Sequence, residues 1–273
     1  MGSDTLRCMT SVSFWPPRHL IRSAWLEHAP FAFWLIQASR PRVIVELGTH
    51  FGFSYLAFCQ AVAYLDLPAR CSAIDTWEGD EHTGYYGNDV FLQLAAVNQE
   101  HYGSFSRLMR MRFDQALAGF RDGEIDLLHI DGRHSYADVL DDFVHWLPKL
   151  SDRAVVLFHD TNVRDRDFGV CKLWVELSGR YPGFEFPHGN GLGVLGVGRD
   201  LPADLMPLFQ SGPETAAVIR AAYARLGSAV TFQSISANAQ SLAAHLRSEI
   251  SARDSLIEQL RVGVATRDPV LIR

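Results

Sequence analysis

Four acidic residues stand at the ends of apolar runs that recur along the chain: Glu46, Asp75, Asp131 and Asp160. Ligands of open parallel sheets bind beyond the carboxyl ends of the strands, so acids that end several strands are expected to meet in one crevice. His134 lies three residues after Asp131, and an imidazole titrates near neutral pH. These residue types fit two kinds of chemistry. His134 could transfer a proton, and the carboxylates of Asp131 and Asp160 could bind a divalent cation such as Mg²⁺.

Two further histidines stand near these acids. His159 directly precedes Asp160, and the alternation of side chains along a strand would point the two to opposite faces. We therefore do not expect His159 as a metal ligand. His129 and Asp131 form an H-x-D triplet of the kind that binds iron, but no third ligand stands at a suitable spacing. For His134 the alternative role is structural, as a cap of the helix that follows it.

The segment ELGTHFGFS (46–54) places Gly48 and Gly52 between an apolar run and an expected helix. Glycine there permits positive φ and a close approach of the backbone to a ligand. This turn has neither the G-x-G-x-x-G pattern nor the GK[ST] of a phosphate loop, which favours a nucleoside without phosphates. Asp75 lies 23 residues beyond Gly52, near the spacing at which an acid binds ribose hydroxyls. The alternative for Asp75 is a turn cap before Thr76.

Apolar runs and helical periodicities alternate through the middle of the chain. Strands are expected at 43–47, 71–75, 107–113, 125–131, 154–160 and 192–198. Helices are expected at 54–65, 89–102, 114–121, 135–150 and 168–180. This alternation predicts an α/β fold with a Rossmann-like, doubly wound and mostly parallel sheet that carries helices on both faces.

The chain divides into three expected regions. Residues 1–40, rich in aromatic groups, form a helical segment that packs on the core; residues 41–200 form the central domain; and residues 201–273 form a helical extension. Within the extension, residues 239–264 carry a heptad-like seam, with one charged intruder: Ala239, Ala243, Leu246, Ile250, Arg253, Ile257, Leu260 and Val264. The seam predicts a coiled coil and hence a homo-oligomer. The alternative is one amphipathic helix folded back on the domain.

Composition excludes some classes of protein. The chain of 273 residues has a net charge of −6 and a pI near 6.0, which argues against nucleic acid as a partner. No apolar run approaches the roughly 18 residues of a membrane span, and the start of the sequence lacks the pattern of a secretory signal. The four cysteines show no C-x-x-C spacing and are expected as reduced thiols, which favours a cytoplasmic protein.

Four motifs occur together in one order: ELGTHFGFS (46–54), DTWEGD (75–80), HIDGRHSY (129–136) and HD (159–160). In this combination the chain resembles the class I S-adenosylmethionine-dependent methyltransferases. More narrowly, it is similar to a bacterial group that resembles sugar O-methyltransferases and is often linked to glycosyltransferases. The resemblance covers about residues 20–198. It implies S-adenosyl-L-methionine as the cofactor and a small-molecule or glycan acceptor.

The resemblance also implies roles for individual residues. Asp75 would bind the ribose diol, and Asp131 and His134 would face the sulfonium and the acceptor, with His134 as the candidate base. The other residues implied to bind the cofactor are Glu46, Gly48, Thr49 and Gly52 at its methionine end, Trp77 over the ribose or adenine, and Phe113 and Asp114 at the adenine. Metal-dependent relatives carry Asn or Asp directly after the second acid, where this chain has Thr161.

Two polar segments follow strand ends and could contact an acceptor. Residues 79–89 could close as a lid, with Asp80, His82, Tyr85 and Tyr86 toward a hydroxylated substrate, or form an ordinary surface loop. In residues 164–168, Arg164 and Arg166 could meet an anionic group or pair with the neighbouring acids in solvent.

The function expected from these observations is methyl transfer to a hydroxyl of a sugar or glycan. Such an alcohol needs a base or a metal to take up its proton. Two alternatives remain open: a non-catalytic, oligomerising module of a polysaccharide-synthesis assembly, with a glycosyltransferase as partner, and an NAD-dependent oxidoreductase.

Overall fold

The structure is a computed structural model that describes residues 7–80, 84–165 and 168–265. His82 and Arg166 of the two polar segments lie outside the described residues. Contacts along the chain define two units, the first ending at Thr231 and the second beginning at Phe232. The first unit thus includes the aromatic N-terminal segment and the residues that follow position 200, in addition to the central domain.

A seven-stranded sheet forms the centre of the first unit, in the order β5-β2-β1-β6-β7-β9-β8. The first five of these strands in spatial order are parallel, and β9 runs antiparallel to both of its neighbours. The strands are β1 (Val43–Leu47), β2 (Arg70–Asp75), β5 (Ser106–Arg110), β6 (Ile125–Ile130), β7 (Leu150–His159), β8 (Gly183–Phe186) and β9 (Leu192–Gly196), and a separate hairpin pairs β3 (Gly79–Asp80) with β4 (Gly84–Tyr85). The predicted mostly parallel, Rossmann-like sheet is confirmed.

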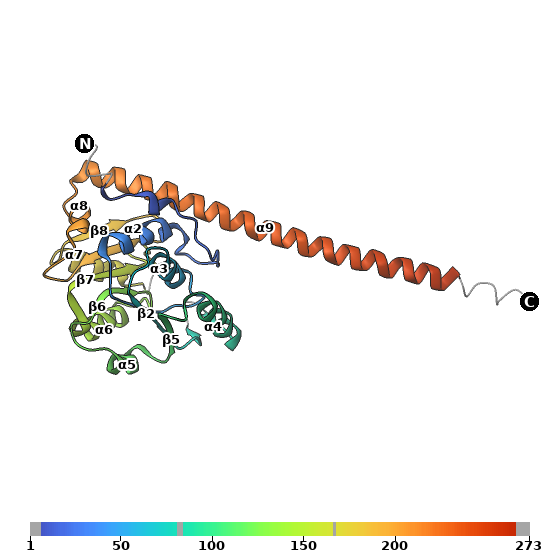
Figure 1. The fold of residues 1–273 in the computed structure, drawn as a ribbon, viewed down its shortest axis with the longest axis horizontal. Coiled ribbons are helices and arrows are strands. Elements are labelled where there is room, and N and C mark those ends of the chain that lie inside the picture. Colours follow the sequence, from blue (N-terminus) through green and yellow to red (C-terminus); the bar gives the residue numbers. More distant parts are fainter. Residues whose placement is uncertain (1–6, 81–83, 166–167, 266–273) are drawn as a thin grey trace, which may run out of the picture. The chain divides into compact units, whose positions relative to one another are not determined.

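Helices cover both faces of the sheet (Figure 1). One buried apolar cluster contains side chains of α2, α3, α4 and the start of α9, and a second contains side chains of α5, α6 and α7. The helices are α2 (Ala29–Ser39), α3 (Phe53–Tyr64), α4 (Asn88–Tyr102), α5 (Phe113–Ala116), α6 (Tyr136–Trp146), α7 (Val170–Ser178), α8 (Met206–Phe209) and α9 (Pro213–Ala265). This two-sided cover explains why the central strands consist of almost uninterrupted apolar residues.

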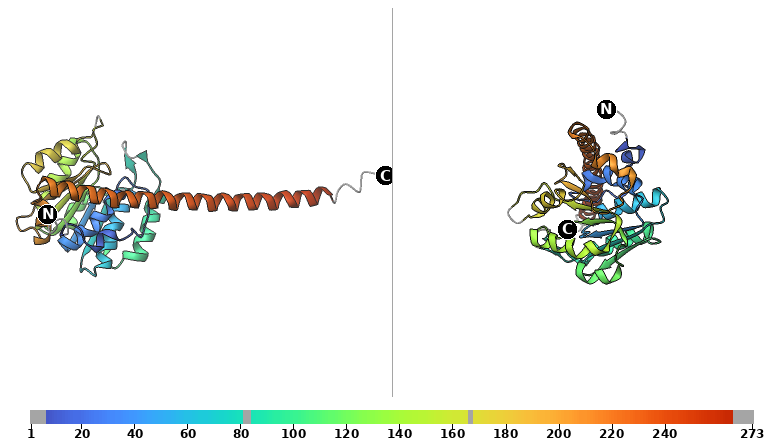
Figure 2. Two further views of the ribbon diagram at one scale, coloured as in Figure 1. Left: turned by 90° about the horizontal axis from the view of Figure 1, so that it is seen from above. Right: turned by 90° about the vertical axis from the view of Figure 1, so that its left-hand side faces the viewer.

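Local sequence signals fix several helix ends. Ser135 caps α6, because its Oγ accepts the backbone N–H of Asp138 at 3.2 Å. Arg40 ends α2 in the left-handed conformation, with φ of 44°, directly before the Pro41 that cannot continue a helix. In the N-terminal segment, the described residues before α2 include the short turns Ser11–Phe14 and Leu26–His28. Its first part packs beside α9 through the Tyr223 hydroxyl, which donates to the carbonyl of Cys8 at 2.7 Å (Figure 2).

Three elements differ from the sequence predictions. The strand predicted at 107–113 is β5, which ends at Arg110, because α5 begins at Phe113. The helix predicted at 114–121 is the single turn α5 followed by a 3₁₀ turn at Leu117–Gly119. No strand was predicted at the position of β8, which is a four-residue edge strand.

Helix α9 is one element from Pro213 to Ala265. From Ser236 to Val262 almost every side chain is solvent-exposed within the described structure. Among the residues that the structure describes, no helix is both long enough and apolar enough to cross a membrane.

Candidate active site

Asp75 organises the turn that follows β1. Its Oδ2 accepts the backbone N–H groups of Thr49 and His50 at 2.8 and 2.9 Å, and its Oδ1 accepts the N–H of Trp77 at 2.8 Å. Because β1 and β2 are adjacent parallel strands, the acid at the end of β2 lies beside the turn that leaves β1. Each carboxylate oxygen has two acceptor sites, so Oδ2 is fully used and Oδ1 can accept one further hydrogen bond from a ligand.

Gly48 allows the ends of β1 and β6 to meet. Its φ is 81°, and an added Cβ would lie 2.1 Å from the carbonyl oxygen of Asp131. The N–H of Asp131 in turn donates to the carbonyl of Leu47 at 2.8 Å. A side chain at position 48 is therefore excluded both by the backbone conformation and by the approach of Asp131. The floor of the site is backbone packed directly on backbone.

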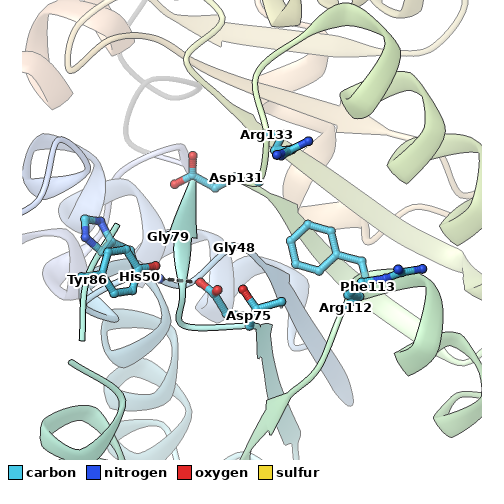
Figure 3. A pocket seen from close by; sticks show the side chains of 11 residues that line it. Gly48, His50, Asp75, Gly79, Tyr86, Arg112, Phe113, Asp131 and Arg133 are labelled. Atoms are coloured by element: carbon cyan, nitrogen blue, oxygen red, sulfur yellow. Dashed lines mark hydrogen bonds between the residues drawn. The ribbon is translucent and has the colours of Figure 1, made fainter. Parts of the chain in front are cut away.

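A cavity of about 450 Å³ opens above this floor, and Figure 3 shows its side chains. We call it the first cavity. Its volume falls in the range of pockets that bind small molecules. It contains four of the residues predicted from the sequence to bind the cofactor: Gly48, Asp75, Phe113 and Asp131. Sequence reasoning missed the other lining residues, which are His50, Thr76, Gly79, Arg112, Gly132 and Arg133, and named Tyr86 only as part of a lid.

Phe113 supplies an apolar wall of the first cavity. Its ring lies against Gly132, where an added Cβ would come within 2.6 Å of the ring edge. The second residue of the D-G pair in HIDGRHSY is thus glycine because an aromatic ring lies over it. In Figure 3 the Phe113 ring and the Asp75 carboxylate both border the first cavity.

A second, more polar cavity of about 820 Å³ adjoins the first. The two share Gly48, His50, Tyr86 and Asp131 in their linings. The second cavity also contains Thr49 and Gly52 of the first turn and the side chains of His134, His159 and Asp160. Further polar groups reach it from other parts of the chain: Arg22, Ser23, Tyr85, Gln93 and Asn190.

Two histidines and two aspartates form a connected cluster in the second cavity. His134 Nε2 lies 2.8 Å from Asp160 Oδ2 and 3.8 Å from Asp131 Oδ1. His159 Nδ1 lies 3.2 Å from Asp131 Oδ1 and 3.5 Å from Asp160 Oδ1. One ligand atom from each of Asp131, His134 and Asp160 lies within 4.8 Å of the other two, which is compact enough to hold a metal ion. Asp131 and Asp160, two of the four acids predicted from the sequence, therefore meet at this edge.

The expectation that His159 points away from Asp160 is wrong. Asp160 has already left β7 and adopts a left-handed φ of 61°, so the alternation that holds within the strand does not reach it. The reversal returns the Asp160 carboxylate to the side of His159. His159 Nε2 also lies 3.2 Å from the carbonyl of Gly189 and can donate to it.

Burial and charge oppose each other in this cluster. Burial favours the neutral acid, but the charge of His159 and the hydrogen bonds from both histidines outweigh it and hold the pKa of Asp131 well below its usual range. The pKa of Asp160 falls to about 2 for the same reasons. Burial lowers the pKa of the two histidines, yet the carboxylates raise that of His134 to about 9 and that of His159 to about 10. At neutral pH the cluster thus consists of two ion pairs.

Three predicted cofactor residues do not line either cavity. Glu46 is fully buried, and its Oε2 accepts from Nδ1 of the equally buried His129 at 2.8 Å. Trp77 is also fully buried and donates from Nε1 to the carbonyl of His50 at 3.0 Å. Asp114 is exposed and pairs with Arg112, whose Nε lies 3.0 Å from its Oδ1. Glu46 and Trp77 therefore support the site from beneath.

Residues 45–161, which carry all four motifs and most of this site, match the family model described as a methyltransferase domain. Over 193 residues the chain is 53% identical to an uncharacterized protein, y4gI, of Sinorhizobium fredii (strain NBRC 101917 / NGR234). The match covers 71% of this chain and 21% of that protein, so the chain spans about a fifth of its relative's length.

Solved structures of similar fold include two methyltransferases. One, from Geobacter sulfurreducens, is 21% identical with a TM-score of 0.45, over 62% of this chain and 78% of that one. The other is the O-methyltransferase TomG from Streptomyces achromogenes, involved in tomaymycin synthesis and solved in complex with SAM. It is 18% identical with a TM-score of 0.48, over 66% of this chain and 83% of its own.

Proposed function

We propose that this protein is an S-adenosylmethionine-dependent O-methyltransferase that binds the methyl donor in the first cavity and a hydroxylated acceptor in the second. One observation carries the proposal: two cavities meet at the carboxyl edge of the sheet and share Gly48, His50, Tyr86 and Asp131. Methyl transfer from a sulfonium is an in-line displacement, so donor and acceptor must meet across one boundary. The match of residues 45–161 to a methyltransferase domain supports the same conclusion and gives no support to an oxidoreductase.

The residues of the first cavity fit the parts of the donor. Oδ1 of Asp75 has one free acceptor site for a ribose hydroxyl, Phe113 offers a flat apolar face for an adenine, and Gly48 lets the Asp131 backbone approach the turn that would border the methionine end. The bound donor supplies a methyl group on a positively charged sulfur. The carboxylate of Asp131, which stays ionised at neutral pH, would lie in the wall nearest that charge.

The second cavity suits an acceptor with several hydroxyl groups. Arg22, Gln93 and Asn190 bring hydrogen-bonding groups from three separate segments, and Tyr85 and Tyr86 add aromatic faces. A sugar presents hydroxyls at its edge and C–H groups on its faces, which such a mixture can bind. We propose a sugar or glycan hydroxyl as the acceptor. Tyr85 is the last residue of β4 and Tyr86 follows it, so this part of the segment at 79–89 would contact the substrate.

His134 and the two acids supply the means to take up the acceptor's proton. His134 is our candidate base, but between two carboxylates it holds its own proton up to a pH of about 9. It must therefore lose one carboxylate contact when the acceptor or a cation binds. A divalent cation between Asp131 and Asp160 would have this effect, since it takes over their negative charge. The donor set of two carboxylates with a nearby imidazole fits Mn²⁺ or Mg²⁺ with added waters.

Calorimetry with S-adenosylhomocysteine tests the proposal. We expect one binding site per chain in the wild type, with NAD⁺ giving no heat. Asp160→Asn should leave this binding unchanged, because Asp160 lines only the second cavity, and should abolish a heat of Mn²⁺ binding. Failure to bind S-adenosylhomocysteine would overturn the donor site. Equal binding of Mn²⁺ by both forms would overturn the cation site alone.

The cellular setting forms part of the same proposal. A glycosyltransferase partner would fit a glycan acceptor, and a cytoplasmic location is supported by four free cysteines, three of them buried.

A further inference from the structure

The second unit presents an apolar seam to solvent. Leu246, Ile250, Ile257 and Leu260 are 47%, 58%, 47% and 61% exposed, although each is a residue that usually avoids water. Their successive spacings are four, seven and three residues, which places them on one stripe of a supercoiled helix. Burying such a stripe requires a second helix with the same period, and a second copy of this chain carries one.

The seam has the heptad positions of a two-stranded coiled coil. The spacings put Ala243, Ile250 and Ile257 at a, and Leu246, Arg253 and Leu260 at d. β-branched residues at a with Leu at d favour two strands in parallel coiled coils. Charged residues at d, e and g then decide whether the two helices run parallel or antiparallel.

A parallel pair would place like charges together. Arg253 at d would face the partner's Arg253 in the core. Glu249, at g, would lie beside the partner's Asp254, at e. Symmetry would repeat the contact between Glu249 and the partner's Asp254. Both repulsions would lie at or next to the buried seam, where solvent screens charges least.

An antiparallel pair removes both conflicts. With Leu246 facing the partner's Ile257, the next layers place Arg253 against the partner's Ile250, and Leu260 against the partner's Ala243. The stem of Arg253 then covers an apolar side chain while its guanidinium reaches the partner's Glu249 at the edge. The small Ala243 meets a large leucine, so the volume of that layer is balanced.

Charge also selects this register. In it Arg247 lies beside the partner's Asp254, and symmetry repeats the pair. A shift of one heptad in either direction would instead bring Arg247 against the partner's Arg247, or Asp254 against the partner's Asp254. Within the described part of the helix, up to Val262, the ion pairs are His245 with Glu249 and Glu258 with Arg261, and Arg247, Arg253 and Asp254 take part in none.

We propose that residues 239–262 form an antiparallel two-stranded coiled coil with a second copy of this chain, in the register that pairs Arg247 with the partner's Asp254. This inference is independent of the proposed methyl transfer. The full chain is then a dimer whose affinity is set by the seam and whose orientation is set by charge.

Asp254→Arg distinguishes the two orientations, with the mass of the full chain in solution measured by sedimentation over a range of concentrations. In the antiparallel pair two ion pairs become two repulsions, and we expect the dimer dissociation constant to rise by about tenfold. In a parallel pair the new arginine would lie beside the partner's Glu249 and tighten the dimer. Arg247→Asp combined with Asp254→Arg should restore wild-type affinity. Ser251→Arg, on the outer face, controls for the added charge.

Spin labels at matched positions measure the orientation directly. Ser241 and Ser248 both lie at the outer f position, and Cys171→Ser removes the half-buried thiol from the background. At 1.5 Å per residue, the antiparallel register separates the two Ser241 labels by about 30 Å along the axis and the two Ser248 labels by about 10 Å. A parallel pair would give nearly equal distances at both positions. Equal distances, a tighter dimer with Asp254→Arg, a monomer at every concentration, or a higher oligomer would each overturn the proposal.

Discussion

Replacing Asp75 by asparagine should weaken both the fold and the donor site. The Asp75 carboxylate accepts three backbone N–H groups at 2.8–2.9 Å, two on Oδ2 and one on Oδ1. An amide has oxygen on one side only. If it keeps the bonds to Thr49 and His50, its NH₂ group faces the N–H of Trp77, and two donors meet.

The loss can be bounded from these contacts. A hydrogen bond to a charged group contributes about 1.5–3 kcal/mol and a neutral one about 0.5–1.5 kcal/mol. Asp75→Asn converts two bonds from the first kind to the second and removes the third, so we expect a loss of roughly 3.5–6 kcal/mol. This is a large part of the stability of about 5–15 kcal/mol that is usual for a domain. The same turn borders the first cavity, so the dissociation constant of S-adenosylhomocysteine should rise at least about tenfold, equivalent to about 1.4 kcal/mol.

Urea unfolding followed by fluorescence measures the first effect and calorimetry measures the second. Glu78→Gln is a matched control, because Glu78 is an exposed acid of the same segment that lines neither cavity. An unchanged unfolding midpoint in Asp75→Asn would refute the role of Asp75 in holding the turn. Wild-type affinity in a destabilised variant would refute its place in the donor site.

Three further changes test the structure. Gly48→Ala should cost at least about 3 kcal/mol of stability, measured in urea, since its new Cβ meets a backbone carbonyl and its φ is positive. Burial, and then the charge of Asp141, raises the pKa of Asp142 to about 7, so the folded state holds a proton that the unfolded chain releases between about pH 4 and 7, and stability falls as pH rises through that window. Asp142→Asn should therefore add on the order of 2–4 kcal/mol at pH 8 and little at pH 4, and an equal gain at both would contradict this. Glu46→Ala should cost about 3–5 kcal/mol by leaving His129 buried without its partner, whereas Glu46→Gln, which keeps an acceptor, should cost far less in the same assay.

The position of the site could be predicted from the sequence because acidic residues stand at the ends of apolar runs. Asp75 and Asp131 came to one edge, as expected, because β1, β2 and β6 are parallel neighbours. Glu46, in contrast, lines neither cavity because of its position within β1. β1 continues one residue beyond it to Leu47, so Glu46 lies within the strand and its side chain is buried with that of His129.

Other features depended on geometry that no short pattern encodes. The left-handed φ of Asp160 placed His159 in the cluster against the rule of alternation. The lining by Arg22 and Asn190 comes from segments far from the motifs, which only the tertiary fold brings to the second cavity. The short β8 has too few residues for its period to be recognised.

The rings of His50 and Tyr86 stack at 4.9 Å with an interplanar angle of 24°, and both residues border both cavities. The two stacked rings are thus part of the lining that the two cavities share. A ligand that displaces the rings in one cavity changes the volume of the other cavity. By thermodynamic linkage, each ligand must then change the affinity of the other by the same factor. The dissociation constant of S-adenosylhomocysteine should therefore depend on the concentration of the proposed acceptor.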